Sequence, residues 1–137
     1  MTTRLHRSFL LEASNESLKV ESNDKIGAVV VLNNTIIGRG HNKTIELNDA
    51  SAHAEILAMR GASDKLKSKY LYNCVLYSTH EPCCMCIGMV GWSHIKEVFY
   101  IKPSSDPAAF NYSGKLARAH DIINLYDWDI KISRMED

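Results

Sequence analysis

The sequence has no excess of charge of either sign and no long hydrophobic run. Lysine and arginine together number 16, and so do aspartate and glutamate, so no global positive field favours a large nucleic-acid partner. No stretch approaches the ~18 apolar residues of a membrane span. The N-terminal residues 1–17 contain neither a long apolar region nor a small-residue cleavage site. We therefore expect a cytoplasmic protein with no membrane partner.

The chain has four cysteines, and most of them lie in one place. Of the four cysteines, Cys83, Cys84 and Cys86 fall within four positions, and Cys74 stands apart. In a reducing compartment, such clustering indicates metal binding or redox chemistry rather than a disulfide framework. No second Cys-x-x-Cys pair accompanies Cys83 and Cys86 to complete a structural Cys₄ zinc site. A third ligand must come from elsewhere in the chain.

The remaining composition is that of one ordinary globular domain. The chain has 137 residues, of which 45% are hydrophobic and 23% are charged. Natural domains cluster at roughly 100–150 residues, and this length can bury a core without help. No internal repeat or low-complexity segment interrupts the chain. We expect a single domain over residues 1–137.

Hydrophobic periodicity predicts an alternation of helices and strands. The expected helices cover about 3–19, 51–61, 83–92 and 115–125, and the expected strands cover 26–32, 35–40, 74–79, 97–101 and 127–132. Asp49 or Ser51 is expected to cap the second helix. Asn33-Asn34 suits a tight hairpin, so the first two strands should be antiparallel. Strands joined through a helix are normally parallel, so the last two should be parallel. The result is a three-layer α/β/α sandwich around a mixed five-stranded sheet.

The cysteine pair suits zinc. Cys83 and Cys86 share one face at the start of a predicted helix, where thiol pKa values are lowered. His53 also opens a predicted helix after a strand, and such helix starts line one edge of a sheet. A His-Cys-Cys set leaves one coordination position for water, which distinguishes a catalytic zinc site from a structural one.

Glu55 has two interpretations. Taken alone, a histidine and a glutamate at a helix start are most often solvated residues. Two residues are about 200° apart around a helix axis, so His53 and Glu55 cannot converge on a target beside the middle of the helix. Both can reach a target beyond its first turn. If His53 binds a metal there, Glu55 can reach the water on that metal.

These residues resemble a known family. The sequence HAE at 53–55, followed after 26 residues by PCCMC at 82–86, is similar to the motif of zinc-dependent cytidine and nucleobase deaminases. The resemblance covers about residues 26–101. It implies a cytidine deaminase-like fold, one zinc ion per chain, and hydrolytic removal of an exocyclic amine as ammonia. It also implies that Glu55 carries protons from the attacking water to the ring nitrogen and the leaving amine.

The resemblance also suggests substrate contacts. Asn42 matches a position that hydrogen-bonds the base or ribose in many family members, although it is equally suited to an ordinary turn. Ala54, inside the motif, is a second candidate. Trp92 is expected to line the core, with stacking against the base as the alternative.

Other residues near the motifs have less specific expectations. His80 either touches substrate or lies in a solvated loop, and the loop is the simpler interpretation. Cys74 and Cys84 lack ligand spacing and are expected to be small buried hydrophobic residues. Asp106 and Phe110 lie where family members often add pocket residues.

Two branches of the family match about equally well. The segment GWSHIKEVFY is similar to bacterial guanine deaminases, whereas NDASAHAEILAMR resembles bacterial tRNA adenosine deaminases equally well. The stretch after Ile132 is expected to be too short for the C-terminal segment of either branch, and Asp24-Lys25-Ile26 replaces the usual proline before the first strand. We expect a free guanine-like or cytosine-like base or nucleoside as substrate, and a homodimer. A tRNA adenosine deaminase, a redox module and a non-catalytic zinc-stabilised scaffold remain alternatives.

Overall fold

The computed structural model describes residues 2–103 and 117–136. In chain order its elements are α1 (Thr3–Ser17), β1 (Gly27–Leu32), β2 (Thr35–His41), α2 (Ala54–Leu66), β3 (Cys74–His80), α3 (Cys84–Ser93), β4 (Glu97–Lys102), α4 (Ala119–Leu125) and β5 (Lys131–Arg134). This order confirms the predicted alternation of helices and strands. Within the described residues, no helix is long and apolar enough to cross a membrane.

The five strands form one mixed sheet in the order β2-β1-β3-β4-β5. Strand β1 pairs antiparallel with β2 and with β3, whereas β3 pairs parallel with β4 and β4 with β5. The hairpin between β1 and β2 turns at Asn33 and Asn34, whose φ angles are 50° and 62°. Asparagine tolerates this left-handed conformation better than most residues. The expected hairpin and the expected parallel pair of last strands are both confirmed.

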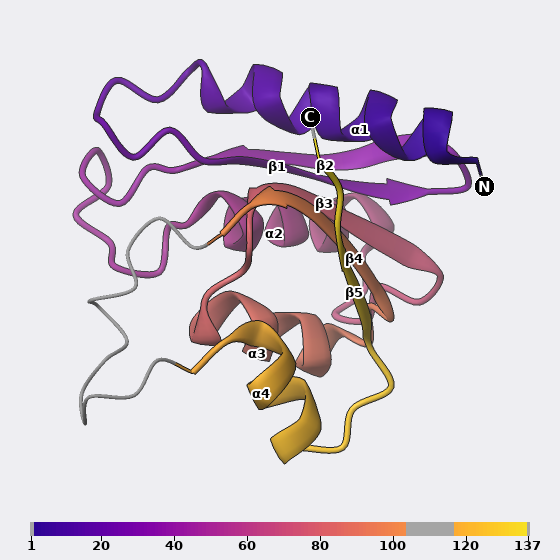
Figure 1. The fold of residues 1–137 in the computed structure, drawn as a ribbon. Coiled ribbons are helices and arrows are strands. Elements are labelled where there is room, and N and C mark those ends of the chain that lie inside the picture. Colours follow the sequence, from indigo (N-terminus) through magenta and orange to yellow (C-terminus); the bar gives the residue numbers. More distant parts are fainter. Residues whose placement is uncertain (1, 104–116, 137) are drawn as a thin grey trace.

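Helices cover both faces of the sheet (Figure 1). Helix α1 lies on one face, and α2, α3 and α4 lie on the other. Side chains alternate between faces along each strand. On β1, Val29 and Val31 join the cluster under α1, whereas Ala28 and Val30 join the cluster on the opposite face. The predicted three-layer sandwich is confirmed.

Helix α2 lies directly against β2 because two glycines leave room for its backbone. A Cβ atom at Gly40 would lie 2.3 Å from the carbonyl oxygen of Ala54, and one at Gly38 would lie 2.0 Å from that of Ala58. Neither contact is possible for a residue with a side chain. The glycines therefore set where the first turn of α2 sits on the sheet.

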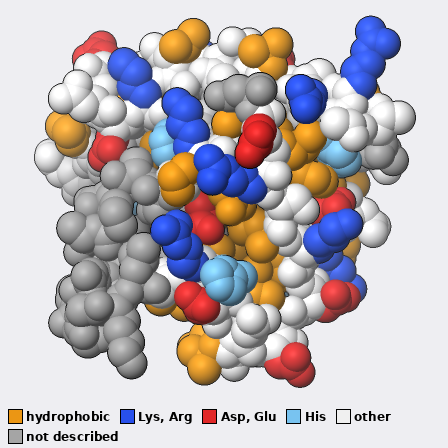
Figure 2. All heavy atoms as spheres, in the orientation of Figure 1, with side chains coloured by type: hydrophobic (Ala, Val, Ile, Leu, Met, Phe, Trp, Pro, Cys, Tyr) orange, Lys and Arg blue, Asp and Glu red, His pale blue; other side chains and the backbone are white. Residues whose placement is uncertain are grey.

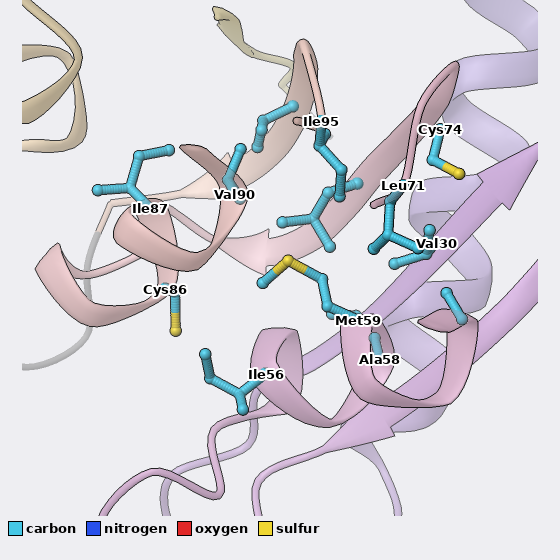
Figure 3. Packing of buried hydrophobic residues seen from close by; sticks show 14 of the residues in the cluster. Val30, Ile56, Ala58, Met59, Leu71, Cys74, Cys86, Ile87, Val90 and Ile95 are labelled. Carbon is cyan, nitrogen blue, oxygen red and sulfur yellow. The ribbon is translucent and has the colours of Figure 1, made fainter. Parts of the chain in front are cut away.

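The space between α2, α3 and the sheet is filled by apolar side chains (Figure 3). Met59 from α2 and Val90 from α3 are fully buried, together with Leu71 and Val30. Closely packed cores hold side chains in defined conformations. Helices α2 and α3 are thus joined to the sheet by one shared apolar layer.

The predicted start of the second helix is wrong. Helix α2 begins at Ala54 with His53 as its N-cap, and His53 makes no side-chain capping bond. The Asp49 carboxylate instead accepts bonds from the backbone nitrogen and the hydroxyl of Ser51, at 2.9 and 2.7 Å. This local turn uses both expected caps before the helix starts.

The C-terminal elements also differ from expectation. Strand β5 begins at Lys131 rather than at residue 127. Asp127 adopts a left-handed conformation with φ of 52°, which a strand does not allow. The Trp128 ring packs over Gly91 of α3, where a Cβ atom on residue 91 would lie 2.5 Å from the ring. Helix α4 begins at Ala119, with Arg118 as N-cap. Residues 115 and 116, where this helix was expected to begin, lie outside the described residues.

Candidate metal centre

Two helix starts meet at the predicted site. His53 is the N-cap residue of α2, and Cys83 is the N-cap residue of α3. Neither uses its side chain as a cap, so both side chains are free to point at a shared target. Cys86 lies within the first turn of α3 and is buried. The structure thus brings together the three residues that the sequence predicts as metal ligands.

Their ligand atoms form a triangle with nearly equal sides. His53 Nδ1 lies 3.5 Å from Cys83 Sγ and 3.5 Å from Cys86 Sγ, and the two sulfurs are 3.5 Å apart. Tetrahedral zinc with ordinary bond lengths to nitrogen and sulfur requires separations of roughly 3.6–3.8 Å. The donor set and its spacing therefore fit zinc.

The three side chains also alter one another's pKa values. The hydrogen bond between the sulfurs, supported by the bond to His53, lowers the pKa of Cys83 to about 4. The same bond, together with burial, raises the pKa of Cys86. The bond to Cys83 raises the pKa of His53. Zinc binds thiolates and neutral imidazole, so binding would displace these protons.

Glu55 is buried beside this triangle. Its side chain is only 3% exposed, and its Oε1 atom has no hydrogen-bond partner among the described residues. Burial is the main cause that raises its pKa to about 7, and the Cys83, His53 and Cys86 side chains also influence it. The solvated interpretation of Glu55 is therefore wrong. A buried carboxyl oxygen without a partner is rare and is typical of a group reserved for a ligand or for catalysis.

Asn42 follows β2, and both ends of its side-chain amide have partners within the chain. Its nitrogen donates to the Asp24 carbonyl at 3.4 Å, and its oxygen accepts from the Thr44 backbone nitrogen at 3.1 Å. These bonds are those of a turn residue. A substrate contact by Asn42 would have to replace one of them.

Ala54 and Trp92 lie in different environments. Ala54 is fully buried in the first turn of α2, directly next to His53. Trp92 is 81% exposed near the end of α3, so the expectation that it lines the core is wrong. It lines an outer groove with Cys84, His94 and Trp128, a placement that lends no support to stacking against a base at the metal triangle.

His80 and two of the cysteines also have defined positions. His80 is the last residue of β3 and bonds through Nδ1 to the Thr79 hydroxyl at 2.8 Å, so the solvated-loop interpretation is wrong. Cys74 is buried as expected, but Cys84 is exposed. Asp106 and Phe110 lie outside the described residues.

Sequence reasoning missed a charged pair next to the metal triangle. Glu81, two residues before Cys83, is buried and accepts a bond from Arg118 Nη1 at 3.2 Å. The only signal in the sequence is the position of Glu81 directly before the Pro-Cys motif. Its partner lies 37 residues away, beyond the reach of any local pattern.

Charges of both signs are mixed on the visible surface. On the face shown in Figure 2, lysine and arginine side chains alternate with aspartate and glutamate. This arrangement agrees with the equal totals of basic and acidic residues. It differs from the continuous basic surface that nucleic-acid binding favours.

Comparison with known families gives a clear match. Residues 3–102 match the family model described as the cytidine and deoxycytidylate deaminase zinc-binding region. The matched range contains the whole metal triangle and Glu55. It also contains α1, all of the antiparallel part of the sheet, and β4.

Curated relatives carry two different names. The chain is 38% identical over 106 residues to the guanine deaminase of Bacillus subtilis strain 168, a match that covers 75% of this chain and 68% of that enzyme. It is 44% identical over 75 residues to the tRNA-specific adenosine deaminase of Aquifex aeolicus, covering 55% of this chain and 50% of that enzyme. The chain thus spans only about half the length of the tRNA-specific relative.

The similar solved structures also include both a tRNA deaminase study and a guanine deaminase. A structure from a study of A-to-I editing by tRNA:A34 deaminases has a TM-score of 0.77 and 30% identity, covering 95% of this chain and 91% of that one. The guanine deaminase structure from Bacillus subtilis has a TM-score of 0.69 and 37% identity, covering 76% and 68%. A dCMP deaminase from cyanophage S-TIM5, at 21% identity and a TM-score of 0.70, shares the fold.

Proposed function

Because this chain belongs to the family of cytidine and deoxycytidylate deaminase zinc-binding domains, we propose that it is a zinc-dependent deaminase of a small nucleobase or nucleoside. In this reaction water replaces an exocyclic amine, and the products are a carbonyl base and ammonia. The observation that carries the proposal is the buried Oε1 of Glu55, which has no hydrogen-bond partner in the described part of the chain and lies beside the His53, Cys83 and Cys86 triangle. A purely structural zinc site has no need of this carboxyl group.

Each residue of the site has a proposed role. His53 Nδ1 and the sulfurs of Cys83 and Cys86 would hold the zinc ion, one per chain. Three protein ligands would leave the fourth position on the ion open to water, and the bound ion would activate that water at neutral pH.

Glu55 is the proposed proton carrier. With its pKa raised to about 7 by burial, it can both accept and release a proton near neutral pH. It takes a proton from the attacking water and gives it to the ring nitrogen. It then takes the remaining proton from the hydroxyl group added to the ring carbon and delivers it to the amine, so that the carbonyl forms and ammonia rather than an amide ion departs. Its burial keeps bulk water away from these transfers.

We favour a free base or nucleoside over RNA as substrate. The equal number of basic and acidic residues provides little of the positive field that holds an RNA backbone. The match to a guanine deaminase also covers more of this chain than the match to the Aquifex tRNA-specific enzyme. A tRNA adenosine deaminase is the second candidate, because the structure from the tRNA:A34 study covers 95% of this chain.

A substrate panel tests this proposal. Zinc-loaded protein is incubated with guanine, adenine, cytosine, their nucleosides, deoxycytidylate and tRNA, and ammonia and inosine are measured. We expect ammonia from one of the small molecules and no inosine in tRNA. Inosine in tRNA alone would favour the second candidate. No ammonia and no inosine from any substrate, with zinc bound, would favour the non-catalytic scaffold instead.

Zinc content under mild oxidation distinguishes a redox module from a zinc-dependent deaminase. Such a module needs Cys83 and Cys86 but has no use for His53 and Glu55. We expect close to one zinc per chain, unchanged by mild oxidant. Loss of the metal with formation of a Cys83–Cys86 disulfide under the same treatment would support the redox alternative.

We propose that the protein works in the cytoplasm as a homodimer. The described residues that line the outer groove are Cys84, Gly88, Gly91, Trp92, His94, Ile122, Tyr126 and Trp128, and none of these is acidic, a lysine or an arginine. Exposed apolar surface of this kind favours a protein interface, and we assign it to a second copy of the chain. Trp92→Glu should then shift the mass in sedimentation equilibrium to that of a monomer. Leu11→Glu, at an exposed position on α1, is the matched control and should leave the mass unchanged.

A further inference from the structure

The short connection between β3 and α3 carries a buried acid. Glu81 follows the last residue of β3 and comes two residues before Cys83. Its side chain is 8% exposed. A buried carboxylate is costly unless hydrogen bonds and an opposite charge compensate it. The partners of Glu81 therefore decide how firmly this connection is held.

Three contacts from other elements hold Glu81. Its carboxylate accepts a hydrogen bond from the Tyr100 hydroxyl of β4 at 3.4 Å and one from Arg118 Nη1 at 3.2 Å. Its backbone nitrogen donates to the carbonyl oxygen of Lys102 at 2.8 Å. The connection that ends in Cys83 is thus tied to β4 and to the start of α4.

Arg118 provides the positive charge in this arrangement and is itself held in place. It is the N-cap residue of α4, and its backbone nitrogen donates to the Asp121 carboxylate at 2.8 Å. Helix α4 packs against α3, with Trp128 after α4 lying over Gly91. The arginine therefore links α4, which packs against the helix that carries Cys86, with the connection that ends in Cys83.

We propose that Arg118 is a positioning residue for the metal centre, acting through Glu81. It touches none of the ligand atoms. By neutralising the buried carboxylate, it keeps Glu81 turned inward, and this fixes the backbone that presents the Cys83 sulfur to zinc. Substitution of a residue that orients a metal ligand commonly lowers metal affinity by about 10- to 100-fold. This inference rests on the proposed zinc site.

The test measures zinc release to an excess of a coloured chelator, which does not depend on any substrate. Arg118→Met keeps an unbranched side chain but removes the charge and the donors, and should release zinc about tenfold faster or more. Arg118→Lys restores the charge and should recover most of the slow release. Arg134→Met is the matched control, because Arg134 donates to the Ile101 carbonyl oxygen rather than to a carboxylate. It should stay within about twofold of the wild type.

Changing Glu81 shows whether Arg118 acts through it. In a Glu81→Gln background no buried charge needs compensation, so adding Arg118→Met should change the release rate by less than about twofold. Tyr100→Phe removes only a neutral donor to Glu81 and should speed release by about two- to fivefold. If Arg118→Met does not fold, the release rate of Tyr100→Phe still tests whether the contacts of Glu81 hold the metal site.

Three results would overturn the inference. In the first, Arg118→Met releases zinc at the wild-type rate, even if its zinc-free form melts at a lower temperature. In the second, Arg118→Met has the same effect with and without Glu81→Gln. In the third, Tyr100→Phe leaves zinc release unchanged where Arg118→Met does not fold. A wild-type chain that binds no zinc contradicts the proposed function itself and this inference with it, whereas a chain that binds zinc but releases no ammonia contradicts only the proposed function.

Discussion

The two faces of the sheet are built from the same strands but hold different kinds of residue. Among the helices that the structure describes, α1 alone covers its face of the sheet, and the side chains beneath it are large, among them Phe9, Tyr77 and Phe99. The opposite face is covered by α2, α3 and α4 and contains many small residues, among them Ala54 and Ala58. Ala54 and Ala58 belong to α2, whose backbone lies directly against Gly40 and Gly38 of β2. The metal triangle lies on this second face.

The α1 face is expected to contribute mainly to folding stability, and the opposite face is expected to contribute the chemistry. On the α1 face, the described polar groups near the core include His6, whose Nδ1 lies 2.7 Å from the Tyr77 hydroxyl and whose ring stacks on Phe99. On the metal face, one oxygen of the buried Glu55 has no hydrogen-bond partner within residues 2–103 and 117–136. Substitutions on the first face should therefore change folding free energy, and substitutions at the triangle should change metal content and activity.

The largest expected effect follows removal of a ligand. His53→Ala leaves only two protein ligands, too few to hold zinc firmly. Zinc should fall from about one per chain to near zero, with loss of activity exceeding the ~10⁴-fold upper range of acid–base effects. Metal analysis and ammonia release check this result. Retention of stoichiometric zinc by the variant would remove His53 from the ligand set.

The next effect separates Glu55 from the metal. Glu55→Gln keeps the size of the side chain but cannot carry a proton, so activity should fall by about 10²- to 10⁴-fold. Zinc content should stay at the wild-type level, because Glu55 is not one of the three proposed ligands. The measurement is ammonia release at matched zinc loading. Wild-type activity in this variant would contradict the proposed proton transfers.

On the α1 face, Phe9→Ala should act on folding alone. Phe9 is buried against Tyr77, with ring centroids 5.3 Å apart, and the truncation should cost about 3 kcal/mol of unfolding free energy. Urea denaturation measures this loss, and metal analysis of the folded fraction should show unchanged zinc. Leu11→Ala, at an exposed position on the same helix, is the control. Loss of zinc by folded Phe9→Ala protein would show that the two faces are coupled.

The smallest effect is expected from an ion-pair cluster at the edge of the α1 face. Arg39 on β2 pairs with Glu12 at 3.0 Å and with Glu16 at 3.4 Å, and Glu16 keeps Lys19 as a second partner at 2.9 Å. Arg39→Ala should therefore cost only about 1 kcal/mol of unfolding free energy. The cost should shrink at high salt. A salt-independent loss of several kcal/mol would mean that these charges matter more than their exposure indicates.

The sequence was sufficient for the features with a local pattern. Hydrophobic periodicity gave the order of helices and strands, and the spacing of Cys83 and Cys86 identified the sulfur pair. His53 followed from the need for a third ligand. Each of these inferences uses either the spacing of residues within one helix or strand, or the order of helices and strands along the chain.

Features that depend on distant contacts could not be predicted in this way. The start of α2 is a separate case, because local spacing allowed either Asp49 or Ser51 to cap the helix and did not show that the two residues bond to each other before it begins. Trp92 is apolar, and only the arrangement of α3 and α4 shows that it is exposed. The bond between Glu81 and Arg118 joins residues 37 positions apart, and the sequence between them contains no pattern that pairs them.

The most direct test of the account is X-ray absorption at the zinc edge of the purified wild-type protein. The account predicts one nitrogen and two sulfur ligands, from His53, Cys83 and Cys86, at about 2.0 and 2.3 Å, with one oxygen ligand completing the tetrahedron. Such a centre has a position open to water and substrate. A centre with four sulfur ligands, or with oxygen ligands alone, would contradict it.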